Sequence, residues 1–122
     1  MQRIGSYLVL ASILVTLSGT PAMAQSVRQF LTSADRIPRN ATALLMPSAR
    51  RLMNELGEAF STVRSEQEAL QARGQPRTIC MPEKVTLNAL EIESRFRSIP
   101  EARRNITVTQ AVREWMAEKH PC

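Results

Sequence analysis

Two cysteines, Cys80 and the final residue Cys122, constrain the fold of this chain more than any other feature. They are the only cysteines in 122 residues, and the chain opens like a protein made for export. Thiols that reach an oxidising compartment pair, so we expect a disulfide between them. Such a bond closes residues 80–122 into one unit. A redox-active pair is the alternative, but the sequence lacks the C-x-x-C spacing that tunes a reactive thiol.

The first 24 residues have the three parts of a secretory signal. Arg3 supplies the positive start, residues 4–17 are mostly apolar, and the Ala-Met-Ala at 22–24 fits the small-x-small rule for cleavage. We predict a signal peptide over 1–24 and a mature chain that begins at Gln25, in the periplasm or secreted. The alternative is an uncleaved anchor. The apolar run is shorter than the ~20 residues that span a bilayer, so we expect no stable membrane insertion after cleavage.

The remainder, 25–122, has the apolar spacing of helices and no strand-like alternation worth assigning. We predict one all-α domain, with helices over 27–36 and 48–73 and an irregular connection over 38–47 that still packs on the core. Gly57 inside the long helix is expected to allow the close approach of another helix. The apolar stripe predicted to be buried on this helix is Leu52, Met53, Leu56, Phe60, Val63 and Leu70. The stripe could be covered within one chain or by a second copy.

Two further helices are predicted after the first cysteine. Thr86 is expected to cap a third helix that Pro100 ends, and Thr107 with Gln110 has the spacing of a capping box for a fourth. His120 is expected to cap the far end of that fourth helix. The disulfide would fasten the start of the third helix to the end of the fourth, so we expect these two to form an antiparallel hairpin. The predicted fold is a small bundle of about four helices with one disulfide.

Charge and residue chemistry exclude several functions. Sixteen basic residues, one of them Arg3, stand against eleven acidic ones. The basic residues are scattered and aromatics are few, so we predict no nucleic-acid partner. The single histidine, His120, cannot build a multi-histidine metal site, and no carboxylate pair or glycine-rich loop suggests catalysis. We predict no enzyme, no metal and no cofactor, and a basic surface suited to an acidic partner.

The last third of the chain carries a recognisable order of motifs. It resembles the C-terminal half of the Rap/Tai family of type VI secretion immunity proteins. That half typically has a Cys-x-Pro, a Val-Thr helix start, an aromatic residue near a Pro-Glu bend and a terminal Pro-Cys. The first half departs from the family, which often has further cysteines and a Tyr–Gly segment there. The matching residues are Cys80, Pro82, Val85, Thr86, Phe96, Pro100, Glu101, Pro121 and Cys122.

The resemblance implies an exported helical protein that binds a peptidoglycan-cleaving amidase toxin and blocks its active-site cleft, often as a homodimer. If the chain has an occluding loop, we expect it over 74–79, because this stretch is polar and lies beside the disulfide. Its candidate partner-binding residues are Arg73, Gly74, Gln75 and Arg77. The alternatives are an ordinary surface connection for the loop, and a stress or chaperone-like envelope protein for the chain.

Overall fold

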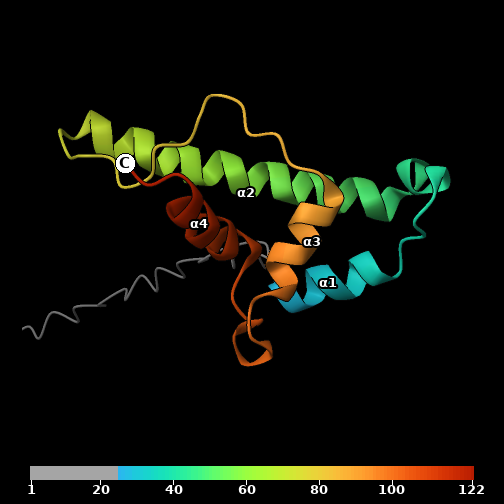
Figure 1. Ribbon diagram of the computed structural model, residues 1–122. Helices are drawn as coiled ribbons and strands as arrows, with labels where there is room; N and C mark the ends of the chain where they lie inside the picture. Colours follow the sequence, from blue (N-terminus) through green and yellow to red (C-terminus); the bar gives the residue numbers. More distant parts are fainter. Residues whose placement is uncertain (1–24) are drawn as a thin grey trace, which may run out of the picture.

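The computed structural model describes residues 25–122, which form an all-α fold (Figure 1). The predicted fold class and the Cys80–Cys122 disulfide are confirmed. The predicted signal peptide, 1–24, lies outside the described residues. Within residues 25–122, no helix is both long and apolar enough to cross a membrane. The elements are α1 (Val27–Asp35), η1 (Ala41–Leu45), α2 (Pro47–Ala72), α3 (Ala89–Arg97), η2 (Glu101–Arg103) and α4 (Val108–Lys119), where η marks a 3-10 helix.

The longest helix, α2, is the element on which the others assemble. It has 26 residues, so it is about 39 Å long at 1.5 Å per residue. Helices α1 and α4 both pack on it, and α3 packs on α1. Pro47 occupies the first helical turn of α2, where its missing N–H removes no hydrogen bond.

Aromatic rings join the helices in the core. The ring of Phe96 on α3 meets Phe30 on α1 edge-on, with centroids 5.1 Å apart, and Trp115 on α4 at 6.5 Å. Phe60 on α2 lies 6.4 Å from the Trp115 ring. The two edge-to-face pairs that Phe96 makes add to the free energy of burial. The buried core is Val27, Phe30, Leu31, Leu52, Leu56, Ala59, Val63, Ile79, Phe96, Ile99, Val108, Ala111, Val112, Trp115 and Met116.

The predicted pairing of the last two helices is wrong. The disulfide does join the chain end to the loop before α3, but residues 81–88 are not helical, so Cys80 does not mark the start of that helix. Helix α4 instead packs mainly along α2. Guanidinium contacts from Arg113 to Glu66 hold the two together midway along α4. The covalent bond therefore stabilises the α2–α4 pair rather than an α3–α4 hairpin.

The start of α3 also differs from the prediction. Asn88, and not Thr86, is the N-cap, and its Oδ1 accepts the N–H of Glu91 at 2.8 Å. Asparagine caps a helix at least as well as threonine. The helix therefore begins at Ala89.

The expectation that Gly57 on α2 allows another helix to approach closely is wrong. Gly57 is exposed, and a Cβ built on it would have no atom within 4 Å.

Capping at the other helices is partly as predicted. Thr107 accepts the N–H of Gln110 at 3.0 Å, which confirms the cap of α4. The Gln110 side chain does not complete a capping box, because it accepts instead from Arg113 one turn on. A full capping box occurs at α1, between Ser26 and Gln29. His120 is the C-cap of α4, as predicted.

Candidate functional site

The turn after α2 contains the four predicted partner-binding residues. Gly74 adopts a φ of 72°, a conformation that favours glycine. Its N–H donates to the Gln71 carbonyl at 3.0 Å, and the N–H of Gln75 donates to the Leu70 carbonyl at 2.9 Å. These two bonds form a Schellman motif, which satisfies carbonyls that a helix end would otherwise leave free. The chain therefore leaves α2 at one fixed angle.

The far side of the same turn is fixed by Gln67, a buried polar residue with 7% of its surface exposed. Its Oε1 accepts the backbone N–H groups of Thr78 at 2.9 Å and Ile79 at 3.0 Å. Its Nε2 donates to the Thr78 hydroxyl at 3.1 Å. A buried amide with both ends bonded holds its neighbours in a defined geometry. Ile79 is itself buried in the core.

The disulfide lies directly after this anchor. Cys80 and Cys122 have Cα atoms 4.9 Å apart, and the Cys80 N–H donates to the His120 carbonyl at 2.8 Å. An isolated bridge joins Ile79 to Pro121. Figure 1 shows the turn at the left end of α2, beside the labelled C-terminus. We call residues 73–79 the α2 turn. Its first end is held by the helix cap at Gly74 and Gln75. Its second end is held by the Gln67 side-chain amide and by the disulfide that follows at Cys80.

The structure places Arg73, Gly74, Gln75 and Arg77 together on the exposed surface of the α2 turn. The Arg73 Nε donates to the Ala69 carbonyl at 3.3 Å, and Arg77 donates to the side chain of Gln71. Within residues 25–122, neither guanidinium has an acidic partner at ion-pair distance. The turn therefore presents two positive charges to the solvent.

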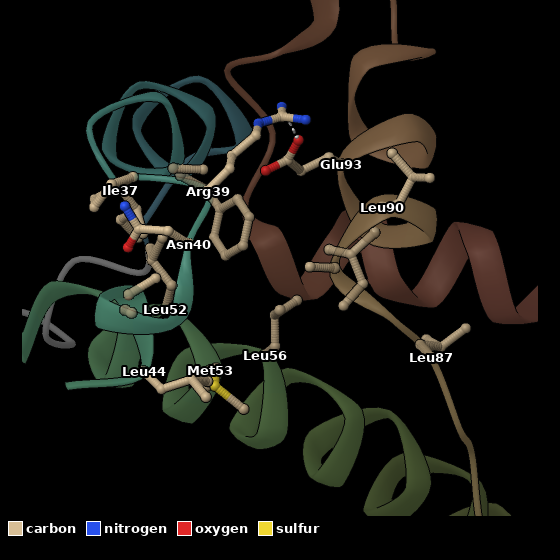
Figure 2. A pocket seen from close by; sticks show the side chains of 17 residues that line it. Ile37, Arg39, Asn40, Leu44, Leu52, Met53, Leu56, Leu87, Leu90 and Glu93 are labelled. Atoms are coloured by element: carbon tan, nitrogen blue, oxygen red, sulfur yellow. Dashed lines mark hydrogen bonds and ion pairs between the residues drawn. The ribbon is translucent and has the colours of Figure 1, made fainter. Parts of the chain in front are cut away.

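A second surface feature, at the other end of α2, is a hollow of about 580 Å³ between α1, η1, α2 and α3. We call it the apolar groove. Figure 2 shows Leu52 and Leu56 from α2 facing it, with Leu90 of α3 across the hollow. Arg39 and Glu93, 2.9 Å apart, form an ion pair at its edge. Sequence reasoning did not find this groove.

Four large apolar side chains around this end of the molecule are exposed. Leu44 is 72% exposed, Leu45 73%, Met53 65% and Leu90 69%. The prediction that Met53 belongs to the buried stripe is therefore wrong. The prediction that 38–47 packs is confirmed only in part, because η1 lies against α2 while its Leu44 and Leu45 side chains face the solvent. Leu52 takes the inward position on α2, and Met53 points about 100° further around the helix, because there are 3.6 residues per turn. In the sequence, the only sign of this exposed apolar surface is the run Leu44-Leu45 in the connection before α2.

No cluster of three or more His, Cys, Asp or Glu side chains in the described part of the chain is arranged to hold a metal ion. The α2 turn and the apolar groove are separated by most of the length of α2, so one small ligand cannot contact both. Comparison with protein-family models, curated proteins and solved structures finds no match for this chain.

Proposed function

We propose that this protein is an exported, non-catalytic binding protein that blocks a periplasmic peptidoglycan-cleaving amidase. The amidase is the partner that the resemblance of residues 80–122 to the Rap/Tai family implies. The observation that carries the proposal is the doubly anchored α2 turn. A protein that blocks a cleft needs a projecting segment that keeps its shape, and this turn is such a segment.

The anchoring of the turn matters for affinity. A loop that is mobile when free loses conformational entropy on binding, at about 0.5–1.5 kcal/mol for each side chain that becomes fixed. The backbone bonds at Gln75 and Ile79 already fix the main chain of the turn before the partner arrives, so binding has to order only the side chains. Arg73 and Arg77 supply charge that favours an acidic patch on the partner and speeds association with it.

The first test is capture of partners with oxidised protein, residues 25–122, from an envelope extract of the source cells. Recovery of an amidase in stoichiometric amount, with loss of its activity on peptidoglycan, supports the proposal. Capture of no amidase contradicts it. The oligomeric state of the free protein, measured in the same preparation, tests the homodimer that the family resemblance implies.

The second test assigns the surface. Arg73→Glu and Arg77→Glu reverse the charge of the α2 turn without touching the core. Each is expected to weaken binding at least about tenfold, equivalent to about 1.4 kcal/mol. The matched control is Arg51→Glu, an exposed arginine near the start of the same helix. Equal affinities for all three variants would place the interface elsewhere.

The apolar groove favours a second candidate, a stress or chaperone-like protein of the envelope. Exposed apolar surface of this kind binds unfolded chains, and the exposed side chains of Met53 and Leu90 supply it. A chaperone should suppress aggregation of an unfolded client protein. Met53→Lys with Leu90→Lys should abolish that activity, whereas Arg73→Glu should leave it unchanged. The two functions therefore respond to different variants.

A further inference from the structure

The end of the molecule that carries η1 has charge of one sign only. Residues 36–54 run from the C-cap of α1 through η1 into the first turns of α2. This segment has four arginines, at 36, 39, 50 and 51, and none of the eleven acidic residues of the chain. We call it the basic end. Figure 1 shows η1 and the start of α2 at the right of the molecule, away from the labelled C-terminus.

Most of this charge is not neutralised within the fold. All four arginines are exposed. Arg36, Arg50 and Arg51 take part in no ion pair formed within residues 25–122, whereas Arg39 pairs with Glu93 at 2.9 Å. Three guanidinium groups are therefore unopposed, and their combined field attracts an anionic partner.

Exposed apolar side chains lie between the arginines. Leu44 and Leu45 of η1 and Met53 of α2 are exposed, and Figure 2 shows Leu44 and Met53 beside the apolar groove. One pair of arginines precedes the two leucines in sequence and the other pair follows them. An apolar tip with cations on both sides suits the surface of an anionic membrane. The apolar groups enter the interface there, while the guanidinium groups stay among the lipid headgroups.

The backbone of η1 is already hydrogen-bonded internally. The N–H of Thr42 donates to the Asn40 Oδ1 at 3.0 Å, and the N–H of Ala43 donates to the Asn40 carbonyl at 3.1 Å. The N–H of Met46 donates to the Ala43 carbonyl at 3.1 Å. Polar groups that are bonded within the protein cost less to remove from water than unpaired ones. The tip can therefore enter the interface without leaving these donors unsatisfied.

A second copy of this chain fits the basic end poorly. Most homodimers have two-fold symmetry, which places the same surface of each chain at the interface. Here that symmetry would set the unpaired arginines of one chain against those of the other. Like charges brought together across an interface repel, so the charge of this end opposes self-association through it.

An acidic protein would supply the missing charge but would find little to recognise at the tip. Within Ala41–Leu45, only Thr42 has a polar side chain. Its hydroxyl already donates to the side chain of Asn40. A layer of anionic lipids needs no directional contacts, because its headgroups move to meet the cations and its acyl region accepts apolar side chains of any shape.

We propose that the basic end docks this protein on the surface of membranes that contain anionic phospholipids. Leu44 and Leu45 enter the interface, and the four arginines lie among the phosphate groups. The contact is peripheral, since no helix within residues 25–122 is suited to span a bilayer. The α2 turn lies at the other end of α2, so docking leaves it exposed. The inference does not depend on the amidase partner proposed above.

The test is the binding of oxidised protein, residues 25–122, to phospholipid vesicles, measured by co-sedimentation. Vesicles of phosphatidylcholine alone are compared with vesicles of equal parts phosphatidylglycerol and phosphatidylcholine. We expect the partition coefficient to be at least about tenfold higher on the anionic vesicles, and to fall as added salt screens the charges. No binding to the anionic vesicles, or equal binding to both kinds, would overturn the proposal.

Charge reversal tests whether the basic end makes the contact. Arg36→Glu with Arg50→Glu should weaken binding to anionic vesicles at least about tenfold. The matched control, Arg73→Glu with Arg77→Glu, changes the net charge equally at the other end of α2. At physiological ionic strength that end lies beyond the Debye length of about 8 Å, so the control should bind like the wild type. Equal weakening by both pairs would overturn the assignment. The control alters only the proposed amidase contact, so the two proposals can fail separately.

The apolar part of the contact has its own test. Leu44→Ser with Leu45→Ser should weaken vesicle binding about tenfold or more, because the exposed leucines then bring no apolar surface to the interface. Unchanged binding of this variant would contradict the proposal. If the free protein is a dimer that this variant dissociates, the tip belongs to a second copy and the proposal is overturned.

A fluorescence measurement reports whether the tip leaves water. The chain has one tryptophan, Trp115, which is buried, so Leu45→Trp adds an exposed reporter. Its emission should shift to the blue when anionic vesicles are added and should not shift with phosphatidylcholine vesicles. The emission of the wild type should stay unchanged in both. A Leu45→Trp protein that binds vesicles without a shift would show that the tip remains in water, and the proposal would be wrong.

Discussion

The side-chain oxygen of Gln67 accepts the backbone N–H of Ile79 at 3.0 Å, twelve residues away in sequence. The same oxygen accepts the N–H of Thr78. One buried amide therefore satisfies two backbone donors and fixes the loop that leads into the disulfide. The exposed α2 turn depends on this contact, which is itself buried.

Replacing this amide should destabilise the protein. Gln67→Ala leaves the N–H groups of Thr78 and Ile79 without a partner, and a buried unsatisfied donor costs about 1–3 kcal/mol. We expect the free energy of unfolding to fall by that amount in denaturant titrations. Glu68→Ala, an exposed neighbour on the same helix, should change it by less than about 0.5 kcal/mol. Equal effects of the two variants would contradict this role of Gln67.

The disulfide should provide much of the stability. It closes a sequence separation of 42 residues, for which the chain-entropy relation gives about 4 kcal/mol as an upper figure. A small domain has about 5–15 kcal/mol in total. Cys80→Ser with Cys122→Ser should therefore unfold at a much lower denaturant concentration, measured by circular dichroism. Reducing agent should lower the midpoint of the wild type and leave that of the double variant unchanged.

The two described glycines should respond oppositely to alanine. Gly57 is helical, exposed and without a neighbour within 4 Å of a new Cβ, so Gly57→Ala should stabilise by about 0.8–1 kcal/mol. Gly74 has a φ of 72°, and an L-residue there costs about 1–2 kcal/mol. Thermal unfolding of both variants should give midpoints on either side of the wild-type value. The same sign for both would contradict the conformations described.

The contact between Arg113 and Glu66 should make stability depend on acid pH. Two bonds from the guanidinium, at 2.8 and 2.5 Å, lower the pKa of the Glu66 carboxyl below its ordinary value, mainly by hydrogen bonding. The stabilisation is therefore complete above the unfolded-state pKa and is lost as pH falls through the lower, folded-state value.

The pH effect is checked with Glu66→Gln. At pH 7 this variant should be less stable than the wild type by no more than about 1 kcal/mol, since water reaches the pair. The difference should shrink as the pH falls below the ordinary pKa of 4.5. Glu68→Gln, two residues further along the helix and exposed, is the control. A difference independent of pH would show that charge is not the cause.

Local signals in the sequence determined the helices and the covalent link. Apolar spacing, the proline at 47 and the cap at Thr107 act over a few residues, so helix ends could be predicted to within a turn. The pairing of Cys80 with Cys122 followed from there being only two cysteines. The position of the α2 turn followed from Gly74, because a helix end that needs a positive φ favours glycine.

Only the tertiary structure decided which faces meet. Helix α4 lies on α2 rather than on α3, because contacts such as Arg113–Glu66 join residues far apart in sequence. For the same reason Met53 is exposed while Leu52, one residue earlier, is buried. The apolar groove depends on the packing of several helices at once. Periodicity indicates that a helix has an apolar face, but burial depends on what the other helices place against it.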